Sequence, residues 1–139
     1  MTSEDGSTVP ISELQDPKNH VLWRRFVADQ IARQLDMIRF GVREVYLIGS
    51  TESESAGAGS DIDLLVYTDG NEEKRALLEL WLDGWSRALA LANYLRTGHM
   101  SQGLLDVHIV TDEGVRAENS FAVMMRSTTE SSRLRARNP

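Results

Sequence analysis

The sequence predicts an α/β (α+β) domain in which a small sheet packs against helices. Apolar residues recur in the order helix, strand, Gly-Ser turn, strand, helix, strand, which is typical of helices packed against one face of a sheet. The chain has 139 residues, of which 41% are hydrophobic and 26% charged, and this fits one globular domain with a real core. The pattern alone leaves open whether the strands pair parallel or antiparallel.

The first predicted helix begins at Asp16 and Pro17. An aspartate can accept hydrogen bonds from the free N–H groups of a helix start, and proline suits the first helical position. We expect residues 1–15 to be largely unstructured, because they show no sustained period. Helical spacing then continues to Gly41, a predicted C-cap, through five apolar residues: Leu22, Phe26, Ile31, Leu35 and Ile38.

Two predicted strands flank a loop of small residues. The first strand, residues 45–48, ends at Gly49, and the loop over residues 51–60 is rich in Ser, Gly and Ala, which suits close approach of a ligand to the backbone. A helical first turn that starts at Ser50 is compatible with this loop. The second strand, residues 61–67, alternates between two faces, with Ile62, Leu64 and Val66 on one and Asp61, Asp63 and Leu65 on the other.

A long helix and a third strand complete the predicted domain. Residues 68–71 form a turn cluster that also offers helix caps. The helix is predicted over about residues 72–96 by apolar residues at helical spacing: Leu78, Trp81, Leu82, Trp85, Leu89 and Ala92. Gly84 weakens this helix by up to ~1 kcal/mol relative to alanine. Residues 104–110 predict the third strand, and a short helix follows with a cap at residue 111 or 112.

Composition narrows the function classes. The chain has no cysteine, which excludes disulfides, thiolate metal sites and cysteine nucleophiles. It has neither the pattern of a secretion signal nor an apolar stretch long enough to cross a bilayer, so we expect no membrane partner and a cytoplasmic location. A formal net charge of −6 argues against nucleic acid as a partner, whereas a divalent metal would still allow a small anionic substrate.

We divide the chain into a disordered N-terminal segment over residues 1–15, one domain over residues 16–126 and a flexible tail over residues 127–139. The tail is basic because it is rich in arginine, and solvated disorder is the favoured interpretation over a binding role. Residues 121–125 fit a helical turn and an edge strand equally well.

The most informative segment runs from Gly49 to Asp63. In a strand, residues i and i+2 project from the same face, so Asp61 and Asp63 present two carboxylates side by side. Mg²⁺ takes oxygen ligands, typically one or two carboxylates plus substrate phosphates. The turn at Gly49 and Ser50 offers backbone N–H groups to those phosphates. Metal ligands beside a phosphate cradle predict phosphoryl or nucleotidyl transfer.

Asp106 is the third candidate metal ligand. Aspartate is a poor strand former and is costly to bury alone, and Asp106 lies in an otherwise apolar run, so it needs a metal, a basic side chain or backbone donors. If the third strand lies beside the second, three carboxylates meet, and divalent cations relieve their repulsion. The competing interpretation is that Asp61 and Asp63 bond nearby backbone in a turn, but the Gly-Ser turn and the strand that follows favour metal binding.

The remaining polar candidates have two interpretations each. Ser50 and Thr51 either bond phosphate or cap a helix, and the glycine before them favours phosphate. We include Ser60 in the nucleotide-binding loop, although bracing that loop is its favoured role. His108 lies on the same strand face as the third aspartate and could reach the site, although a satisfied, half-buried histidine is the favoured interpretation.

These residues resemble the minimal nucleotidyltransferases of the DNA polymerase β superfamily. The resemblance rests on Gly49-Ser50, the loop, Asp61-Ile62-Asp63 and Asp106, and it spans residues 45–110. The tryptophan-rich helix followed by residues 104–108 is also similar to nucleotidyltransferase modules associated with PEP/pyruvate-binding dikinase-like proteins.

The resemblance implies a mixed sheet flanked by helices and a transfer of nucleoside monophosphate from a nucleoside triphosphate, most simply ATP, to a hydroxyl acceptor with release of pyrophosphate. Asp61 and Asp63 would hold Mg²⁺ or Mn²⁺. Asp106 would bind the catalytic metal and help activate the acceptor hydroxyl. Gly49 and Ser50 would contact the β- and γ-phosphates. A partner protein or a homodimer would supply the acceptor site, because the chain has no obvious acceptor-binding domain.

One departure from the family pattern leaves alternatives open. Minimal members often carry an arginine shortly after Gly-Ser, where this chain has Thr51-Glu52-Ser53-Glu54, and glutamates beside a triphosphate are unfavourable. The alternative function is a catalytically weak or inactive binding module that acts with a partner protein, in a toxin–antitoxin pair or a dikinase-like assembly. A metal-dependent phosphohydrolase is a third candidate, which release of phosphate instead of pyrophosphate would distinguish.

Overall fold

The computed structural model describes residues 9–69, 71–117, 123 and 132–134. Its elements, in chain order, are α1 (Ile11–Gln15), α2 (His20–Gln34), α3 (Met37–Phe40), β1 (Val42–Ile48), α4 (Gly49–Glu52), β2 (Ile62–Thr68), α5 (Glu72–Thr97), β3 (Leu105–Thr111), α6 (Asp112–Arg116) and β4 (Arg133–Leu134). The predicted order of helices and strands is confirmed. Residues 121–125, for which the sequence left two interpretations, lie outside the described residues except for residue 123.

The described strands form a mixed sheet with the order β3-β2-β1-β4. Strands β1 and β2 pair antiparallel, whereas β2 and β3 pair parallel. A parallel pair needs a long crossover, and the 26 residues of α5 provide it. The predicted small mixed sheet flanked by helices is therefore confirmed, and the direction of each pairing, which the sequence pattern left open, is set by the connections.

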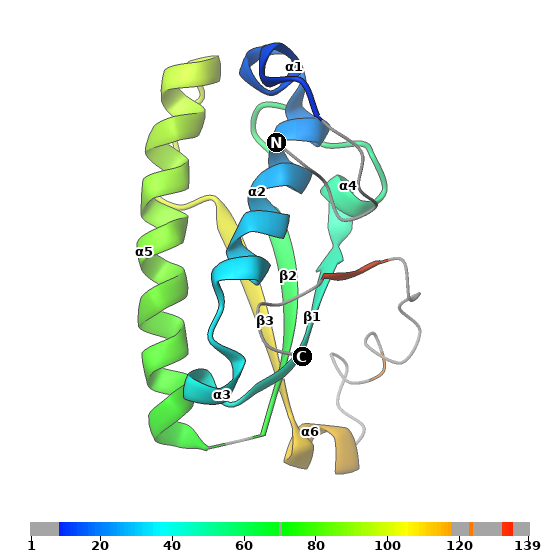
Figure 1. Cartoon of the computed structure of the whole chain (residues 1–139), viewed down its shortest axis with the longest axis vertical. Helices are drawn as coiled ribbons and strands as arrows, with labels where there is room; N and C mark the ends of the chain where they lie inside the picture. The colour runs from blue at the N-terminus through cyan, green and yellow to red at the C-terminus, as the bar shows by residue number, and fades with distance from the viewer. Residues whose placement is uncertain (1–8, 70, 118–122, 124–131, 135–139) are drawn as a thin grey trace.

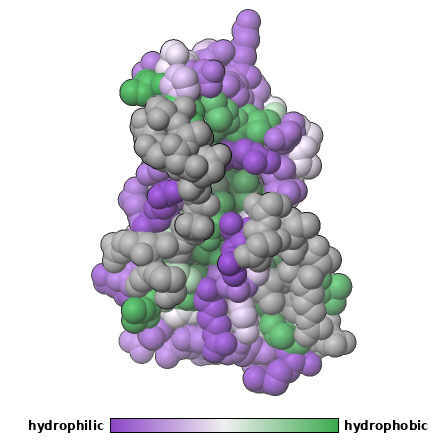
Figure 2. Space-filling view, turned by 45° about the vertical axis from the view of Figure 1, so that its right-hand side comes forward, coloured by the Kyte–Doolittle hydropathy of each residue, from purple (hydrophilic) through white to green (hydrophobic). Residues whose placement is uncertain are grey.

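Helices α2 and α5 lie against one face of the sheet (Figure 1). The core between them is formed by buried side chains of both helices and of β1 and β2, including Val27, Ile31, Leu47, Ile62, Leu64, Leu78 and Leu89. The opposite face of the sheet carries a smaller cluster built on Tyr46, Leu65 and Val110. Figure 2 shows one side of the molecule, where the described surface is mostly hydrophilic with hydrophobic residues scattered among it. No described helix has the length and apolar character that crossing a bilayer requires.

The long helix α5 matches its prediction closely. It begins after Asn71, whose side chain accepts a hydrogen bond from the Lys74 N–H, and it ends at Gly98, which has a φ of +79°. Trp81 and Trp85 pack against the core and meet edge to face, with ring centroids 6.0 Å apart. Both tryptophans are thus structural residues of the helix.

The single helix predicted from residues 16–17 to Gly41 is wrong, because the chain forms two helices there. Asp16 accepts a hydrogen bond from the Lys18 N–H in a turn, and α2 begins instead after Asn19, whose side chain accepts one from the Leu22 N–H. Helix α2 ends at Gln34, and Asp36 then caps the separate helix α3. The predicted C-cap at Gly41 is confirmed, with a φ of +66°.

The predicted apolar face of this helix is also partly wrong. The buried face of α2 runs through Trp23, Val27, Ala28 and Ile31, whereas Leu22 and Phe26 are only half-buried. Ile38 lies on α3 and is 74% exposed. The break before α3 changes the helical phase, so side chains spaced as one long stripe in the sequence do not share one face.

The predicted disorder of residues 1–15 is wrong for residues 11–15, which form α1 with Leu14 buried. The Arg96 guanidinium holds this segment by donating hydrogen bonds to the carbonyl oxygens of Leu14 and Asp16. In the predicted flexible tail, Arg133–Leu134 forms β4 and pairs with β1. Residues 1–8 and the rest of the tail lie outside the described residues, so the division of the chain into domains stays a prediction.

Candidate active site

The pairing of β2 with β3 positions the central carboxylates. In the parallel register, Asp63 lies opposite Asp106 and Leu65 lies opposite His108. Because Ile62 and Leu64 enter the core under the helices, the alternation of the strand turns Asp63 to the opposite face of the sheet. Two carboxylates separated by more than forty residues in the sequence therefore lie side by side on neighbouring strands.

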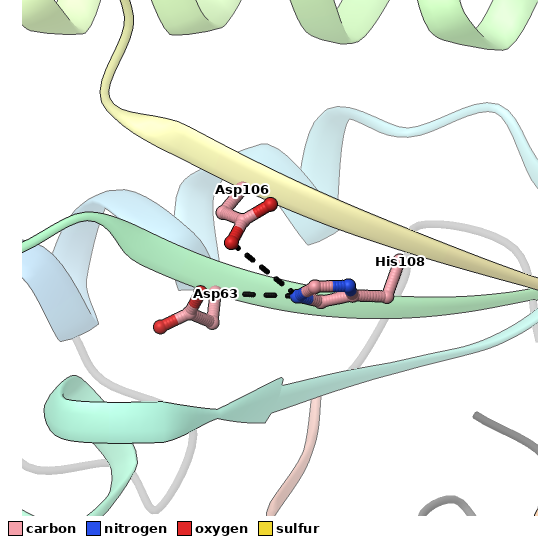
Figure 3. Close-up of side chains that lie close together, drawn as sticks. All are labelled: Asp63, Asp106 and His108. Atoms are coloured by element: carbon pink, nitrogen blue, oxygen red, sulfur yellow. Dashed lines mark ion pairs between the residues drawn. The ribbon is translucent and has the colours of Figure 1, made fainter. Parts of the chain in front are cut away.

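Asp63, Asp106 and His108 form one cluster (Figure 3). One ligand atom from each lies within 4.8 Å of the other two. The His108 Nε2 is 3.5 Å from an Asp106 oxygen and 3.9 Å from an Asp63 oxygen. The histidine is half-buried, as predicted. Its neighbours are the two site carboxylates, so it lies in the site, which was the less favoured of its two predicted locations.

Burial raises the pKa of Asp63 to about 6, and the Asp106 carboxylate contributes through a hydrogen bond and through charge repulsion. The imidazole of His108 opposes this rise in pKa. Two carboxyl groups this close cannot both ionise without cost unless a cation neutralises them. Two carboxylates and an imidazole are also a donor set suited to divalent cations, with carboxylates suiting Mg²⁺ and imidazole suiting transition metals. The residues present therefore fit a divalent metal.

Asp61 lies beside this cluster but outside the close group of three. It precedes β2 by one residue and is exposed. Partial desolvation of its carboxyl and repulsion from Asp106 raise the pKa of Asp61, while Arg24 and His99 act in the opposite direction. The structure thus couples Asp61 to Asp106 electrostatically, and it places Asp63 rather than Asp61 in direct contact with the third carboxylate.

Gly49 allows the Gly-Ser turn to pass close to Asp63. Its φ is +73°, in the left-handed region that favours glycine. A Cβ atom at this position would lie 2.2 Å from an Asp63 oxygen, well inside contact distance. Ile48, just before it, pairs with Asp63 across β1 and β2. Any larger residue at position 49 would displace either the turn or the carboxylate.

The loop residues divide between the surface and the interior. Ser50 is partly exposed at the turn, whereas the Thr51 side chain is fully buried and its Oγ1 has no hydrogen-bond partner among the described residues. This placement does not favour the predicted contact between the Thr51 side chain and phosphate. The Ser60 hydroxyl accepts a hydrogen bond from the Gly57 N–H at 2.9 Å, so the bracing role is confirmed.

Arg24 and Asn93 hold the C-terminal end of the loop over residues 51–60, and neither was predicted as a site residue. The fully buried Arg24 donates hydrogen bonds to the carbonyl oxygens of Ser60 and Ala58 and to the Asn93 side chain. Asn93 donates a further one to the Ala58 carbonyl at 2.9 Å. Because Ser60 directly precedes Asp61, these bonds fix where the carboxylate pair starts. One sequence feature could have indicated Arg24: it lies at helical spacing with the buried apolar residues of α2, where an arginine needs hydrogen-bond partners.

Arg25 contacts the other end of the loop. It lies on α2 and donates hydrogen bonds to the carbonyl oxygens of Thr51, at 3.3 Å, and Glu52, at 2.7 Å. Its guanidinium also lies 3.7 Å from the Glu54 carboxylate. A helix far from the loop in sequence therefore places a positive charge beside the turn, where the Gly-Ser segment itself carries none.

Comparison with known proteins places this geometry in a family. The family described as "Nucleotidyltransferase domain" matches residues 29–131, which is more than half of the chain and contains every predicted site residue. A solved structure of a protein from Sulfolobus solfataricus, provisionally assigned as a nucleotidyltransferase, is 17% identical and covers 83% of this chain and 85% of its own, with a TM-score of 0.40. No curated protein matches the chain.

The matched residues include the motif indicated by the sequence, a Gly-Ser turn followed by two aspartates one residue apart. The match also agrees with the expected superfamily of minimal nucleotidyltransferases. The chain belongs to the nucleotidyltransferase domain family.

Proposed function

We propose that the protein transfers a nucleoside monophosphate from ATP to a hydroxyl acceptor, with release of pyrophosphate, and that it depends on Mg²⁺ or Mn²⁺. The observation that carries this proposal is the contact between Asp63 and Asp106 across parallel strands, directly beside the Gly49 turn. Membership of the nucleotidyltransferase family supports nucleotidyl transfer in general. The nucleotide, the metal and the acceptor class are our inference.

In this proposal, Asp63 and Asp106 hold the divalent metal and Asp61 completes its ligands from the loop end. The metal supplies positive charge to the phosphates and to the attacking oxygen when it is bound. Burial and the adjacent Asp106 carboxylate raise the pKa of Asp63, which supports this assignment because a bound cation would favour the ionised form.

The chain's own contribution is positioning. Gly49 and Ser50 bring the backbone beside Asp63, where they would contact the β- and γ-phosphates. The Asp106 carboxylate would accept a hydrogen bond from the acceptor hydroxyl and then take its proton as the hydroxyl oxygen attacks. Arg24 and Arg25 fix the two ends of the loop, so the phosphate-binding backbone and the carboxylates keep their mutual orientation. Catalysis would then depend on orientation and electrostatics, without a covalent intermediate.

The experiment that tests this proposal is binding of a non-hydrolysable ATP analogue, measured by calorimetry with and without Mg²⁺ or Mn²⁺. Binding should require the metal and should be lost in Asp63→Asn while circular dichroism stays unchanged. The matched control is Glu79→Gln, a change of an exposed carboxylate on α5, which should bind normally. No binding by the unaltered protein at millimolar nucleotide and metal would contradict the proposal.

A second candidate is a catalytically weak or inactive binding module that acts with a partner protein. The observation in its favour is the loop after Gly49-Ser50, where Glu52 and Glu54 add negative charge and the Thr51 side chain is buried. A stable partner complex that survives Asp61→Ala and Asp63→Ala would support this candidate. Release of inorganic phosphate instead of pyrophosphate would instead indicate a phosphohydrolase.

A further inference from the structure

We propose that the outward face of α5 pairs with the same face of a second copy of this chain, as an antiparallel two-helix contact. This inference concerns a surface remote from the carboxylate cluster and does not rest on the proposed activity. Figure 1 shows α5 along one side of the molecule, with the sheet and α2 to its other side.

The outward face carries a second apolar stripe. The core-facing side of α5 buries Leu78, Leu82 and Leu89. Four further leucines on the helix are between 44% and 75% exposed: Leu77, Leu80, Leu91 and Leu95. Together with Gly84 and Ala88, which are also exposed, they form what we call the outer stripe. A row of exposed leucines along one face of a helix can mark an interaction surface.

The spacing of the outer stripe makes it straight. Each member of its first half recurs eleven residues later: Leu77 and Ala88, Leu80 and Leu91, Gly84 and Leu95. An eleven-residue repeat corresponds to just over three full helical turns, so the stripe follows the helix axis with little drift. A straight stripe about 27 Å long can lie along an equivalent straight stripe over its whole length.

The outer stripe is also complementary to itself when reversed. In an antiparallel pair centred near residue 86, Leu77 lies opposite Leu95 of the second copy, and Leu80 lies opposite Leu91. Gly84 then lies opposite Ala88, so the two smallest residues meet at the centre. Small residues at a crossing point let two helices approach to about 8 Å. A parallel pair would set Asp83 against Asp83 and Arg87 against Arg87, which is unfavourable because like charges repel.

Gly84 itself has no explanation within one chain. A Cβ atom at this position would meet no other atom within 4 Å, so the fold does not need a glycine there. A glycine inside a helix is less favourable than alanine. Close approach of a second helix would account for this cost.

The charges beside the stripe fit the same arrangement. Asp83 and Arg87 flank its centre on one side, exposed, with their side chains 2.9 Å apart. The two-fold operation that brings Gly84 opposite Ala88 also brings Asp83 close to Arg87 of the second copy, and the reverse. Along the edge of the contact the order would be Asp83, Arg87 of the second copy, Arg87, and Asp83 of the second copy. Each arginine would then lie about 3 Å along the axis from an aspartate of the other copy, which favours this register over its shifted alternatives.

The contact is small. A stripe about 27 Å long and roughly 10 Å wide covers only a few hundred Å² per copy, which is below the area of a standard stable interface. We therefore expect a weak dimer whose population rises with concentration, with a dissociation constant of about 10–1,000 µM.

Sedimentation velocity of the full chain across about 10 µM to 1 mM tests this inference. The unaltered protein should shift from monomer to dimer over this range. Leu91→Lys and Gly84→Gln should each raise the dissociation constant at least about tenfold, while Gly84→Gln also raises the melting temperature of the dilute monomer. The matched control is Ile38→Lys, which alters an equally exposed apolar residue on α3 and should leave association unchanged.

A charge swap and a cross-link test the geometry. Arg87→Asp should weaken association about threefold to tenfold, and the double variant Asp83→Arg, Arg87→Asp should restore it. Because the chain has no cysteine, Leu77→Cys mixed with Leu95→Cys should cross-link through a short bismaleimide. Leu77→Cys alone should not, since its two copies would lie about 27 Å apart. A protein that stays monomeric at 1 mM, a dimer insensitive to Leu91→Lys, or efficient self-linking of Leu77→Cys would overturn the inference.

Discussion

Replacing Asp63 with asparagine is expected to stabilise the metal-free domain at neutral pH. Burial and the adjacent Asp106 raise the pKa of Asp63 from 3.8 to about 6. A carboxyl group with a raised pKa stabilises the fold while it is protonated. Its contribution is fully present below pH 3.8 and is lost as the pH rises through about 6. At pH 7 the folded domain therefore carries an ionised Asp63 at a cost that asparagine, with nearly the same shape, does not incur.

The size of this effect follows from the two pKa values of Asp63. They differ by about 2.2, and at about 1.36 kcal/mol per pH unit the upper bound is about 3 kcal/mol. The Asp63 side chain is 24% exposed, and solvent screens part of the repulsion, so we expect a gain of about 1–2 kcal/mol. For a domain of this length, that gain corresponds to a rise of roughly 3–8 °C in Tm.

Thermal unfolding in a chelator, followed by calorimetry at pH 7 and pH 4, measures this gain. Asp63→Asn should melt above the unaltered protein at pH 7, and the difference should nearly vanish at pH 4, where Asp63 is protonated in the fold. Glu79→Gln should show neither effect. Added Mg²⁺ or Mn²⁺ should stabilise the unaltered protein but not Asp63→Asn, because only the former has the full donor set. A variant less stable than the unaltered protein at pH 7, or a gain equal at both pH values, would refute this reasoning.

Three further substitutions test the surroundings of the site. Gly49→Ala should destabilise the fold by about 2–4 kcal/mol in urea titrations and weaken metal binding, because its Cβ would meet Asp63. The control is Gly57→Ala, whose Cβ would meet no atom within 4 Å. Arg24→Met should cost about 3–5 kcal/mol, because it leaves the buried oxygens that Arg24 contacts without a donor. It should also make the end of the loop sensitive to limited proteolysis, and resistance equal to that of the unaltered protein would contradict the role of Arg24. Ser86→Ala should cost about 1–2 kcal/mol and speed hydrogen exchange at the start of β3, where the Ser86 hydroxyl accepts two backbone hydrogen bonds.

Local chemistry made much of the fold predictable. The strand that ends at Gly49, the long helix over residues 72–97 and the cap at Thr111 all follow from residues adjacent in sequence. Thr111, for example, accepts the Gly114 N–H with its own side chain, as a cap predicted from sequence should. The break before α3 was missed because apolar residues continue at helical spacing across it, although Asp36, which caps α3, is of a residue type that favours caps over helix interiors.

Long-range pairing was not predictable in the same way. An apolar run with a period of two indicates a strand, but it carries no information about which strand lies beside it or in which direction. The contact of Asp63 with Asp106 depends on a parallel register set by α5. Arg24 was missed for the same reason, because its partners at Ala58, Ser60 and Asn93 are all more than thirty residues away.

The site is costly to the fold, and this cost bears on the choice between an enzyme and an inert scaffold. Asp63 is ionised beside Asp106 at neutral pH, Gly49 adopts a left-handed conformation to clear that carboxylate, and the Thr51 hydroxyl is buried without a described partner. Strained or unpaired groups of this kind cluster where function requires them. A domain that served only to hold a partner would be more stable with a neutral residue at position 63 and would lose nothing by it. These features therefore support the proposed metal site over an inert scaffold.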